Sequence, residues 1–339
     1  MQTKLNPGKL LNSNGDLVEA GYAFNLAKNY DRKDIKGLKT RIKEWDYYYI
    51  GDDNYGLALT IADNSLYGLV SFSILDFKNK KEVTKSMMKF FTFGKWNLPN
   101  TSETGDLVVK NKKFHFEFYN EFGNRHLACF RSDGKGKDFS CDIKLNLTSQ
   151  KSMVIATPFN KKRHFYYNQK INLLQVSNGS FTYGDLHYDF PKTALGVLDW
   201  GRGVWTYSNT WYWSSMSTYY KGRKIGFNLG YGFGDTSKAS ENMLFVDNEA
   251  YKLEDVEFQI PQKNGKDDYL SPWKLVSKDN SIDLTFTPIL DRFANMNVLV
   301  IQSVQHQVFG RFSGTFKVNG KSYEIKDCIG FAEKVKNRW

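Results

Sequence analysis

Residues 140–147, with the sequence SCDIKLNL, alternate strictly between polar and apolar side chains. A period of two is typical of a β-strand with one buried face and one solvated face. The same alternation recurs in residues 113–118 (KFHFEF) and 282–286 (IDLTF). Strands with one solvent-exposed face are typical of antiparallel sheets, so the sequence predicts antiparallel pairing.

Composition supports a β-rich chain. Aromatic residues make up 16% of the 339 residues, and 27 glycines far outnumber 7 prolines, a mixture typical of strands joined by many turns. Asn-Gly pairs at 14–15, 178–179 and 319–320 predict two-residue hairpins. Helical character is expected only over residues 23–44, while residues 84–93 fit a short helix or a strand.

The two halves of the sequence look related. Residues 175–181 (QVSNGSF) are similar to residues 317–323 (KVNGKSY), and each half opens with a strand headed by tryptophan and other aromatic residues. We therefore predict two domains, 1–191 and 192–339, each long enough for eight or more strands that bury their edges by closing into a barrel. The alternative is that hairpins in any β-protein resemble one another.

Several classes of protein are excluded or disfavoured. No apolar run approaches the roughly 20 residues of a membrane span, and residues 1–7 lack the pattern of a signal peptide. Cys129, Cys141 and Cys328 show no metal-ligand spacing, which suggests free thiols in a reducing cytoplasm. We find no phosphate-binding glycine loop and no nucleophile elbow. The expectation is a cytoplasmic protein without metal or cofactor.

The formal net charge is +11, and basic residues cluster at 78–81, 110–113, 135–137 and 161–163. Each cluster lies between strand-like runs, as solvated turns do. The functional alternative to solvated turns is that these basic clusters contact an anionic membrane surface or nucleic acid. Because no nucleic-acid-binding module is recognisable, we expect no nucleic acid partner, whereas peripheral membrane contact through the basic surface stays open.

Residues 195–205, with the sequence LGVLDWGRGVW, indicate where the protein acts. This stretch and the two tryptophans that follow it hold four of the eight tryptophans, together with an acid and an arginine, as a buried ligand pocket requires. Core packing is the alternative for each indole. The candidate ligand-binding residues are Trp200, Arg202, Trp205, Trp211 and Trp213.

Asp199 is the first candidate catalytic acid, because aromatic surroundings would raise the pKa of its carboxyl. A bidentate pair with Arg202 is the other interpretation, because the spacing suits a strand end that enters a turn eased by Gly201 and Gly203. Such a pair would lower that pKa, make a structural clasp, and leave the arginine for an anionic ligand group. Glu333 is the second candidate acid, and Arg292 is a further candidate ligand-binding cation.

Residues 198–205 (LDWGRGVW), 286–288 (FTP), 307–314 (QVFGRFSG) and 330–333 (GFAE) resemble the signature of the bacterial DUF2804 family, a domain of unknown function. More distantly, the layout is similar to two-domain lipocalin-like proteins such as AttH, carotenoid 1,2-hydratases and tocopherol cyclases. This resemblance implies two tandem lipocalin-like barrels with an apolar-ligand pocket near their junction. Some of these relatives hydrate or cyclise prenyl-type substrates by acid catalysis, although the local motifs here differ from theirs.

The sequence therefore predicts an all-β chain of two tandem lipocalin-like antiparallel β-barrels with few short helices. We expect it to bind a small apolar or amphipathic molecule. The alternative is an acid-catalysed lyase or isomerase that acts on a prenyl or polycyclic substrate, so whether it is an enzyme stays open, as does its oligomeric state.

Overall fold

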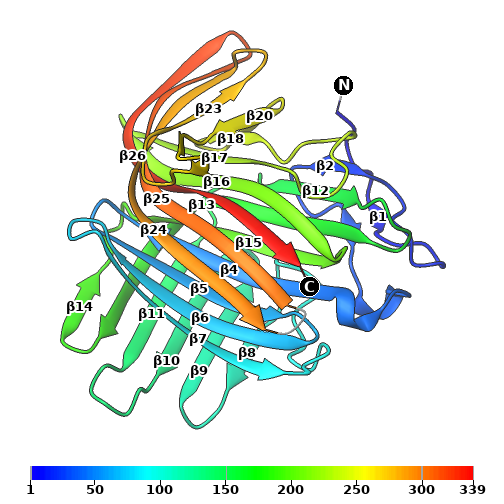
Figure 1. The fold of residues 1–339 in the computed structure, drawn as a ribbon, viewed down its shortest axis with the longest axis horizontal. Coiled ribbons are helices and arrows are strands. Elements are labelled where there is room, and N and C mark those ends of the chain that lie inside the picture. The colour runs from blue at the N-terminus through cyan, green and yellow to red at the C-terminus, as the bar shows by residue number, and fades with distance from the viewer. Residues whose placement is uncertain (1, 150, 299–300, 339) are drawn as a thin grey trace.

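The computed structural model describes residues 2–149, 151–298 and 301–338, and it consists of two large curled antiparallel sheets (Figure 1). The helices in these ranges are two 3₁₀ turns, Arg32–Asp34 and Lys39–Arg41. None of these described ranges contains a helix with the length and apolar character that a membrane crossing requires. The two curled sheets confirm the predicted all-β class and are consistent with two tandem lipocalin-like barrels.

The first sheet follows the order β7-β6-β5-β4-β15-β13-β11-β10-β9-β8, and β2, β12 and β14 attach to it. Its strands are β2 (Gly21–Ala23), β4 (Ile42–Gly51), β5 (Tyr55–Asp63), β6 (Tyr67–Asp76), β7 (Lys81–Phe90), β8 (Leu107–Lys110), β9 (Phe114–Glu121), β10 (Asn124–Arg131), β11 (Phe139–Asn146), β12 (Met153–Pro158), β13 (Phe165–Tyr183), β14 (Leu186–Asp189) and β15 (Leu195–Val204).

The second sheet follows the order β19-β18-β17-β16-β26-β25-β24-β23-β20. Its strands are β16 (Ser208–Tyr220), β17 (Arg223–Tyr231), β18 (Met243–Val246), β19 (Glu249–Lys252), β20 (Val256–Gln259), β23 (Trp273–Ser277), β24 (Ile282–Val298), β25 (Ile301–Val318) and β26 (Lys321–Arg338). Two small ribbons complete the fold: β1 (Gly8–Lys9) with β3 (Lys28–Asn29), and β21 (Gln262–Lys263) with β22 (Lys266–Asp267).

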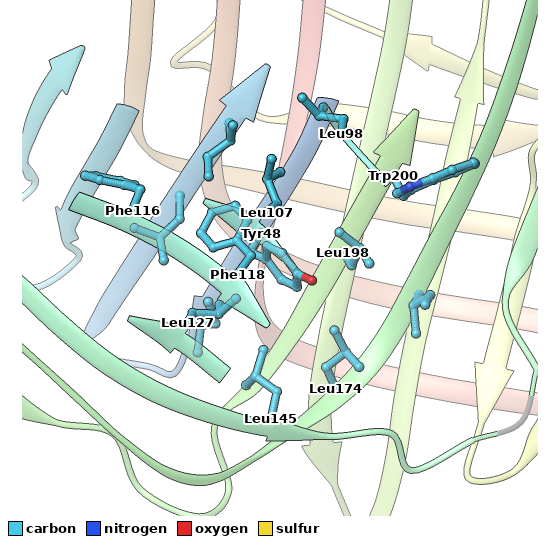
Figure 2. Packing of buried hydrophobic residues seen from close by; sticks show 14 of the residues in the cluster. Tyr48, Leu98, Leu107, Phe116, Phe118, Leu127, Leu145, Leu174, Leu198 and Trp200 are labelled. Carbon is cyan, nitrogen blue, oxygen red and sulfur yellow. The ribbon is translucent and has the colours of Figure 1, made fainter. Parts of the chain in front are cut away.

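Each sheet has its own apolar core, and further buried apolar side chains lie between the sheets. Figure 2 shows part of the first core, to which β9 contributes Phe116 and Phe118, β11 contributes Leu145 and β15 contributes Trp200. The alternation in residues 140–147 has the predicted effect, because Cys141, Ile143 and Leu145 are buried while the intervening polar side chains are not.

The two sheets divide between β15, which ends at Val204, and β16, which begins at Ser208. Strand β15 pairs with β13 and β4, so it belongs to the first sheet. The domain boundary between residues 191 and 192 stays a prediction of the sequence. The sheets contact each other through β13 and β15 of the first and β16 and β17 of the second.

The structure confirms some of the predicted turns and strands and contradicts others. Asn319-Gly320 forms the expected turn between β25 and β26, with φ of 49° and 72°. The hairpin predicted at Asn178-Gly179 is wrong, because this pair lies inside β13 beside a register shift opposite Lys144. The resemblance between residues 175–181 and 317–323 therefore does not mark equivalent positions. Residues 84–90 belong to a strand, and residues 23–44 form only the two 3₁₀ turns as helix.

Candidate functional site

Strand β15 carries the aromatic and charged motif, and it is buried along its whole length. Its glycines were expected to ease a turn, but the motif continues as a strand. Because successive side chains of a strand point to opposite faces, the motif is split between two environments. Trp200 packs in the core of the first sheet with Tyr30 and Tyr167, and Arg202 stacks on the Trp200 ring at 4.3 Å. Asp199 lies on the other face, toward the second sheet.

Arg202 pairs with Asp46 and not with Asp199, which corrects the pairing considered from the sequence. Its Nη2 donates to Asp46 Oδ1 at 3.0 Å and to the carbonyl of Pro99 at 2.8 Å. Its Nη1 donates to the carbonyls of Trp45 and Gly201, at 2.8 and 2.9 Å. Positions 199 and 202 are three apart on one strand and so face opposite ways. Arg202 is a fully buried clasp within the first sheet.

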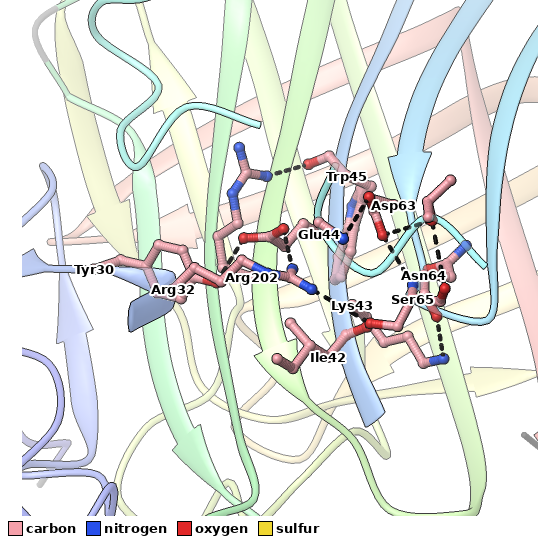
Figure 3. A network of polar contacts seen from close by, with 12 residues as sticks. Tyr30, Arg32, Ile42, Lys43, Glu44, Trp45, Asp63, Asn64, Ser65 and Arg202 are labelled. Atoms are coloured by element: carbon pink, nitrogen blue, oxygen red, sulfur yellow. Dashed lines mark hydrogen bonds and ion pairs between the residues drawn. The ribbon is translucent and has the colours of Figure 1, made fainter. Parts of the chain in front are cut away.

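A second polar group lies beside this clasp (Figure 3). Glu44 accepts a hydrogen bond from the Tyr30 hydroxyl at 2.6 Å and forms an ion pair with Arg32. Arg32 and Glu44 also line a hollow of about 630 Å³, together with Phe93, Leu98 and Pro99. Since Arg202 donates to the Pro99 carbonyl, the clasp also ties down one wall of this hollow.

The other face of β15 contributes to a largely buried group of polar and aromatic side chains between the sheets, which we call the intersheet cluster. Its members come from β4, β13 and β15 of the first sheet, from β16, β17, β25 and β26 of the second, and from the segment before β18. They are Trp45, Tyr47, Asn168, Lys170, Asp199, Trp211, Trp213, Asn228, Glu241, Gln307 and Glu333.

Asp199 is held by neutral donors. Its Oδ1 accepts from Asn168 Nδ2 at 2.5 Å, and Trp45 supplies a further hydrogen bond. It forms no ion pair with any described residue. Asp199 keeps 7% of its surface accessible, as does Tyr47.

Lys170 provides the central cation of the cluster. Its Nζ pairs with Glu241 Oε2 at 2.7 Å and lies 4.0 Å from the centre of the Trp213 ring. The indole nitrogen of Trp213 donates to Asn228 Oδ1 at 2.7 Å, and Asn228 in turn donates to the Glu241 carbonyl. These contacts fix the orientation of the ammonium group and of the indole ring below it.

Glu333 accepts three hydrogen bonds and is almost fully buried. Trp211 Nε1 donates to one carboxyl oxygen at 3.0 Å, and the amides of Gln305 and Gln307 donate to the other at 3.1 and 3.0 Å. The Tyr47 hydroxyl donates to Gln307 at 3.3 Å. No described residue forms an ion pair with Glu333.

Two further predicted residues lie at the margin of the cluster. Arg292 donates from Nη1 to Ser73 Oγ at 2.9 Å and lies 5.9 Å from the centre of the Tyr47 ring. Trp205 packs edge to face against Trp45 at 5.3 Å and against Trp211 at 5.8 Å. Both sheets therefore contribute aromatic faces to one side of the cluster.

Burial dominates the electrostatics of the two candidate acids. Desolvation raises the pKa of the Asp199 carboxyl, against the opposing effects of Lys170 and of the hydrogen bonds from Asn168 and Trp45. Desolvation likewise raises the pKa of Glu333, although Trp211, Lys170 and Arg292 oppose it. Raised carboxyl pKa values between aromatic walls favour a site that holds and transfers a proton.

Within residues 2–149, 151–298 and 301–338, no three or more His, Cys, Asp or Glu side chains form a group that could hold a metal ion. The structure also records a hollow of about 800 Å³ lined by Asn120, Phe122 and Arg125, at the far end of the first sheet. No member of the intersheet cluster lines either of the two hollows.

Comparison with known protein families identifies the family of this chain. A family model described as DUF2804, a domain of unknown function, matches residues 2–339. The chain belongs to the DUF2804 family. No curated protein matches the sequence of this DUF2804 chain.

Solved structures share its fold at low sequence identity. A putative AttH from Nitrosomonas europaea is 12% identical, with a TM-score of 0.55, and the match covers 91% of this chain and 97% of that one. Kievitone hydratase from Nectria haematococca is 16% identical, with a TM-score of 0.54 and coverage of 99% and 98%. CghA with Sch210972 is 9% identical, with a TM-score of 0.51 and coverage of 98% and 97%.

The structure brings six of the eight predicted site residues of this DUF2804 chain to one place. Around the intersheet cluster lie Asp199, Trp205, Trp211, Trp213, Arg292 and Glu333. Trp200 and Arg202 lie on the opposite face of β15. Sequence reasoning missed Lys170 and Glu241. Lys170 stands in the run of residues 165–170 (FYYNQK), whose polar and apolar residues show no alternation, and Glu241 lies in a loop 71 positions away.

Gly201 shows how closely the motif is packed against β4. A Cβ atom at this position would lie 1.9 Å from the Trp45 ring, so Gly201→Ala should displace the indole beside Asp199. We expect the free energy of unfolding to fall by about 1–3 kcal/mol, the usual effect of overpacking, as measured by urea denaturation. Gly37→Ala is the matched control, because its nearest neighbour would be 3.5 Å away. Equal effects of the two changes would contradict the packing argument.

Proposed function

We propose that this protein binds a small apolar or amphipathic molecule at the intersheet cluster. The observation that carries the proposal is a set of unpartnered hydrogen-bond acceptors beside aromatic walls. Asn168 Oδ1 and Asn172 Oδ1 are buried and accept no hydrogen bond from any described residue. Asn168 donates to Asp199 within the cluster, and Asn172, further along β13, donates to Ser215 Oγ on β16 at 2.9 Å, so both amides face the second sheet. Buried acceptors without partners point to a donor that lies outside the chain.

The chemistry of the cluster favours a ligand with hydroxyl groups. Carboxyl oxygens of Asp199 and Glu333 and the free amide oxygens are acceptors, whereas the indole nitrogens of Trp211 and Trp213 already donate within the chain. A largely apolar molecule with a few hydroxyl donors would match both the aromatic surfaces and these acceptors.

Native mass spectrometry of freshly purified protein tests this proposal, because a bound molecule adds its mass to the intact chain. Trp211→Leu should reduce the bound fraction or its affinity about tenfold through loss of aromatic contact. Trp96→Leu is the matched control, since Trp96 is also half-buried but packs with the core of the first sheet. An unchanged affinity in Trp211→Leu, or an equal loss in both variants, would place the ligand elsewhere.

Proton transfer to the bound molecule is the second candidate function. Burial raises the pKa of Asp199 and no ion pair with a described residue offsets this, so the carboxyl is suited to donate a proton. The nearby Trp45, Trp211 and Trp213 rings could stabilise a cationic intermediate. The structural neighbour kievitone hydratase is named for the addition of water, a reaction that a general acid can catalyse, and this supports the second candidate.

A further inference from the structure

Three phenylalanines at the free edge of the first sheet are exposed side by side. Phe90, Phe91 and Phe93 keep 56%, 63% and 39% of their surface accessible. The rings of Phe90 and Phe91 lie 6.2 Å apart, and those of Phe91 and Phe93 are stacked at 6.2 Å with an interplanar angle of 14°. Phe90 is the last residue of strand β7, which has only β6 as a neighbour in the sheet, and Phe91 and Phe93 follow it directly. Contiguous exposed apolar side chains of this kind mark an interaction surface.

The backbone holds these rings outward. Phe91 and Phe93 have φ of 59° and 47°, a conformation that is a genuine outlier for a bulky side chain. Between them Thr92 is buried, and its hydroxyl donates to Asp63 Oδ1 at 2.8 Å. The Gly94 amide donates to the other Asp63 oxygen at 2.8 Å. The hydrogen bonds from Thr92 and Gly94 to the Asp63 carboxylate therefore hold the backbone in a strained conformation that leaves Phe91 and Phe93 exposed.

Four exposed lysines lie near the phenylalanines, either in sequence or in the same hollow. Lys89 and Lys95 flank the segment in sequence, while Lys33 and Lys39 line the same hollow as Phe93. All four are exposed, and none forms an ion pair with a residue in the part of the chain that the structure describes. Lysine on an edge strand also discourages strand pairing, but that role does not explain the exposed aromatic rings.

We propose that this aromatic–basic patch, formed by Phe90, Phe91, Phe93, Lys33, Lys39, Lys89 and Lys95, docks on the surface of an anionic lipid bilayer. Phenylalanine side chains would enter the boundary between headgroups and acyl chains, and the lysines would face the acidic headgroups. A second copy of the chain is disfavoured as the occupant, because a symmetric contact would bring two sets of unpaired lysines together. This inference is independent of the intersheet cluster.

Cosedimentation with large unilamellar vesicles tests the proposal. We expect binding to vesicles of phosphatidylserine and phosphatidylcholine in equal parts, and little binding to phosphatidylcholine alone. Phe91→Ser/Phe93→Ser should weaken binding about tenfold or more, because the inserted apolar area is lost. Phe122→Ser is the matched control, since Phe122 is 83% exposed and also has a positive φ of 43°, but lies in the turn between β9 and β10.

A charge exchange provides a second set of variants. Lys89→Glu/Lys95→Glu should weaken binding by at least an order of magnitude, since each basic residue near an acidic surface contributes about a fivefold factor. Lys112→Glu/Lys113→Glu changes the net charge equally at the turn between β8 and β9 and should have a much smaller effect. Circular dichroism checks that each variant is folded.

Three kinds of result would overturn the proposal. The first is a wild-type protein that does not bind the acidic vesicles, or patch variants that bind as their controls do. The second is a concentration-dependent dimer that Phe91→Ser/Phe93→Ser abolishes, which would make a second copy the occupant. The third is single-stranded DNA that binds at the patch and competes with the vesicles, because aromatic rings among lysines also suit nucleic acid.

Discussion

Replacing Arg202 with methionine should lower the free energy of unfolding by about 3–5 kcal/mol, the usual effect of removing one partner of a buried ion pair. Arg202 and Asp46 are 0% and 1% exposed, so the remaining carboxylate would be left without a cation in the protein interior. The carbonyls of Trp45, Gly201 and Pro99 would also lose their donors. Urea denaturation followed by tryptophan fluorescence measures the change.

An exposed ion pair provides the control for this prediction. Lys274 and Asp283 pair at 3.2 Å with side chains that are 51% and 65% exposed, so Lys274→Met should lower the free energy of unfolding by less than about 1 kcal/mol. The double variant Arg202→Met/Asp46→Leu should recover part of the lost stability, because no buried charge remains. Equal effects of Arg202→Met and Lys274→Met would refute a structural role for Arg202 and return it to the candidate ligand-binding residues.

The different outcomes for Arg202 and Asp199 show how far the sequence can lead. Period-two alternation predicted the strands, because it depends only on neighbours along the chain. The same rule places positions 199 and 202 on opposite faces once residues 195–204 are known to form an uninterrupted strand. The glycines at 201 and 203 suggested a turn instead, whereas Gly201 is required by the Trp45 ring on the adjacent strand. That requirement depends on strand order, which a single sequence does not reveal.

Contacts between residues far apart in the chain could not be predicted for the same reason. The density of tryptophans drew attention to Trp211 and Trp213, and the motif of residues 330–333 drew attention to Glu333. All three lie in one cluster. The Lys170–Glu241 pair that completes this cluster joins two sheets, and nothing in the local pattern of either segment indicates the other. Residue type could therefore suggest the acids of the site, but only the packing of the sheets shows which charges surround them.

The Asp199→Asn variant should show the largest effect on function, since it removes the proposed proton donor while leaving an oxygen to accept from Asn168 and Trp45. If the protein transfers a proton to the molecule identified by mass spectrometry, turnover should fall about 10²–10⁴-fold, the usual contribution of a general acid. Binding of that molecule should persist, because Trp211, Trp213 and the free amide oxygens are unchanged. Turnover that survives the substitution would exclude Asp199 as the acid, and Glu333→Gln would then be the next variant.

The pH dependence of stability tests the basis of this role without any ligand. Burial raises the pKa of Asp199 in the folded chain, so the folded state binds the proton more tightly than the unfolded state. The ionised carboxyl therefore destabilises the fold as the pH rises above the unfolded pKa of about 4. Asp199→Asn should be more stable than the wild type at neutral pH, and the difference should vanish as the pH falls toward about 4. Asp189→Asn is the control, because that side chain is 79% exposed and should show no such gap. A constant difference across this range would mean that Asp199 titrates alike in both states, and the raised pKa on which the proposed proton transfer rests would be refuted.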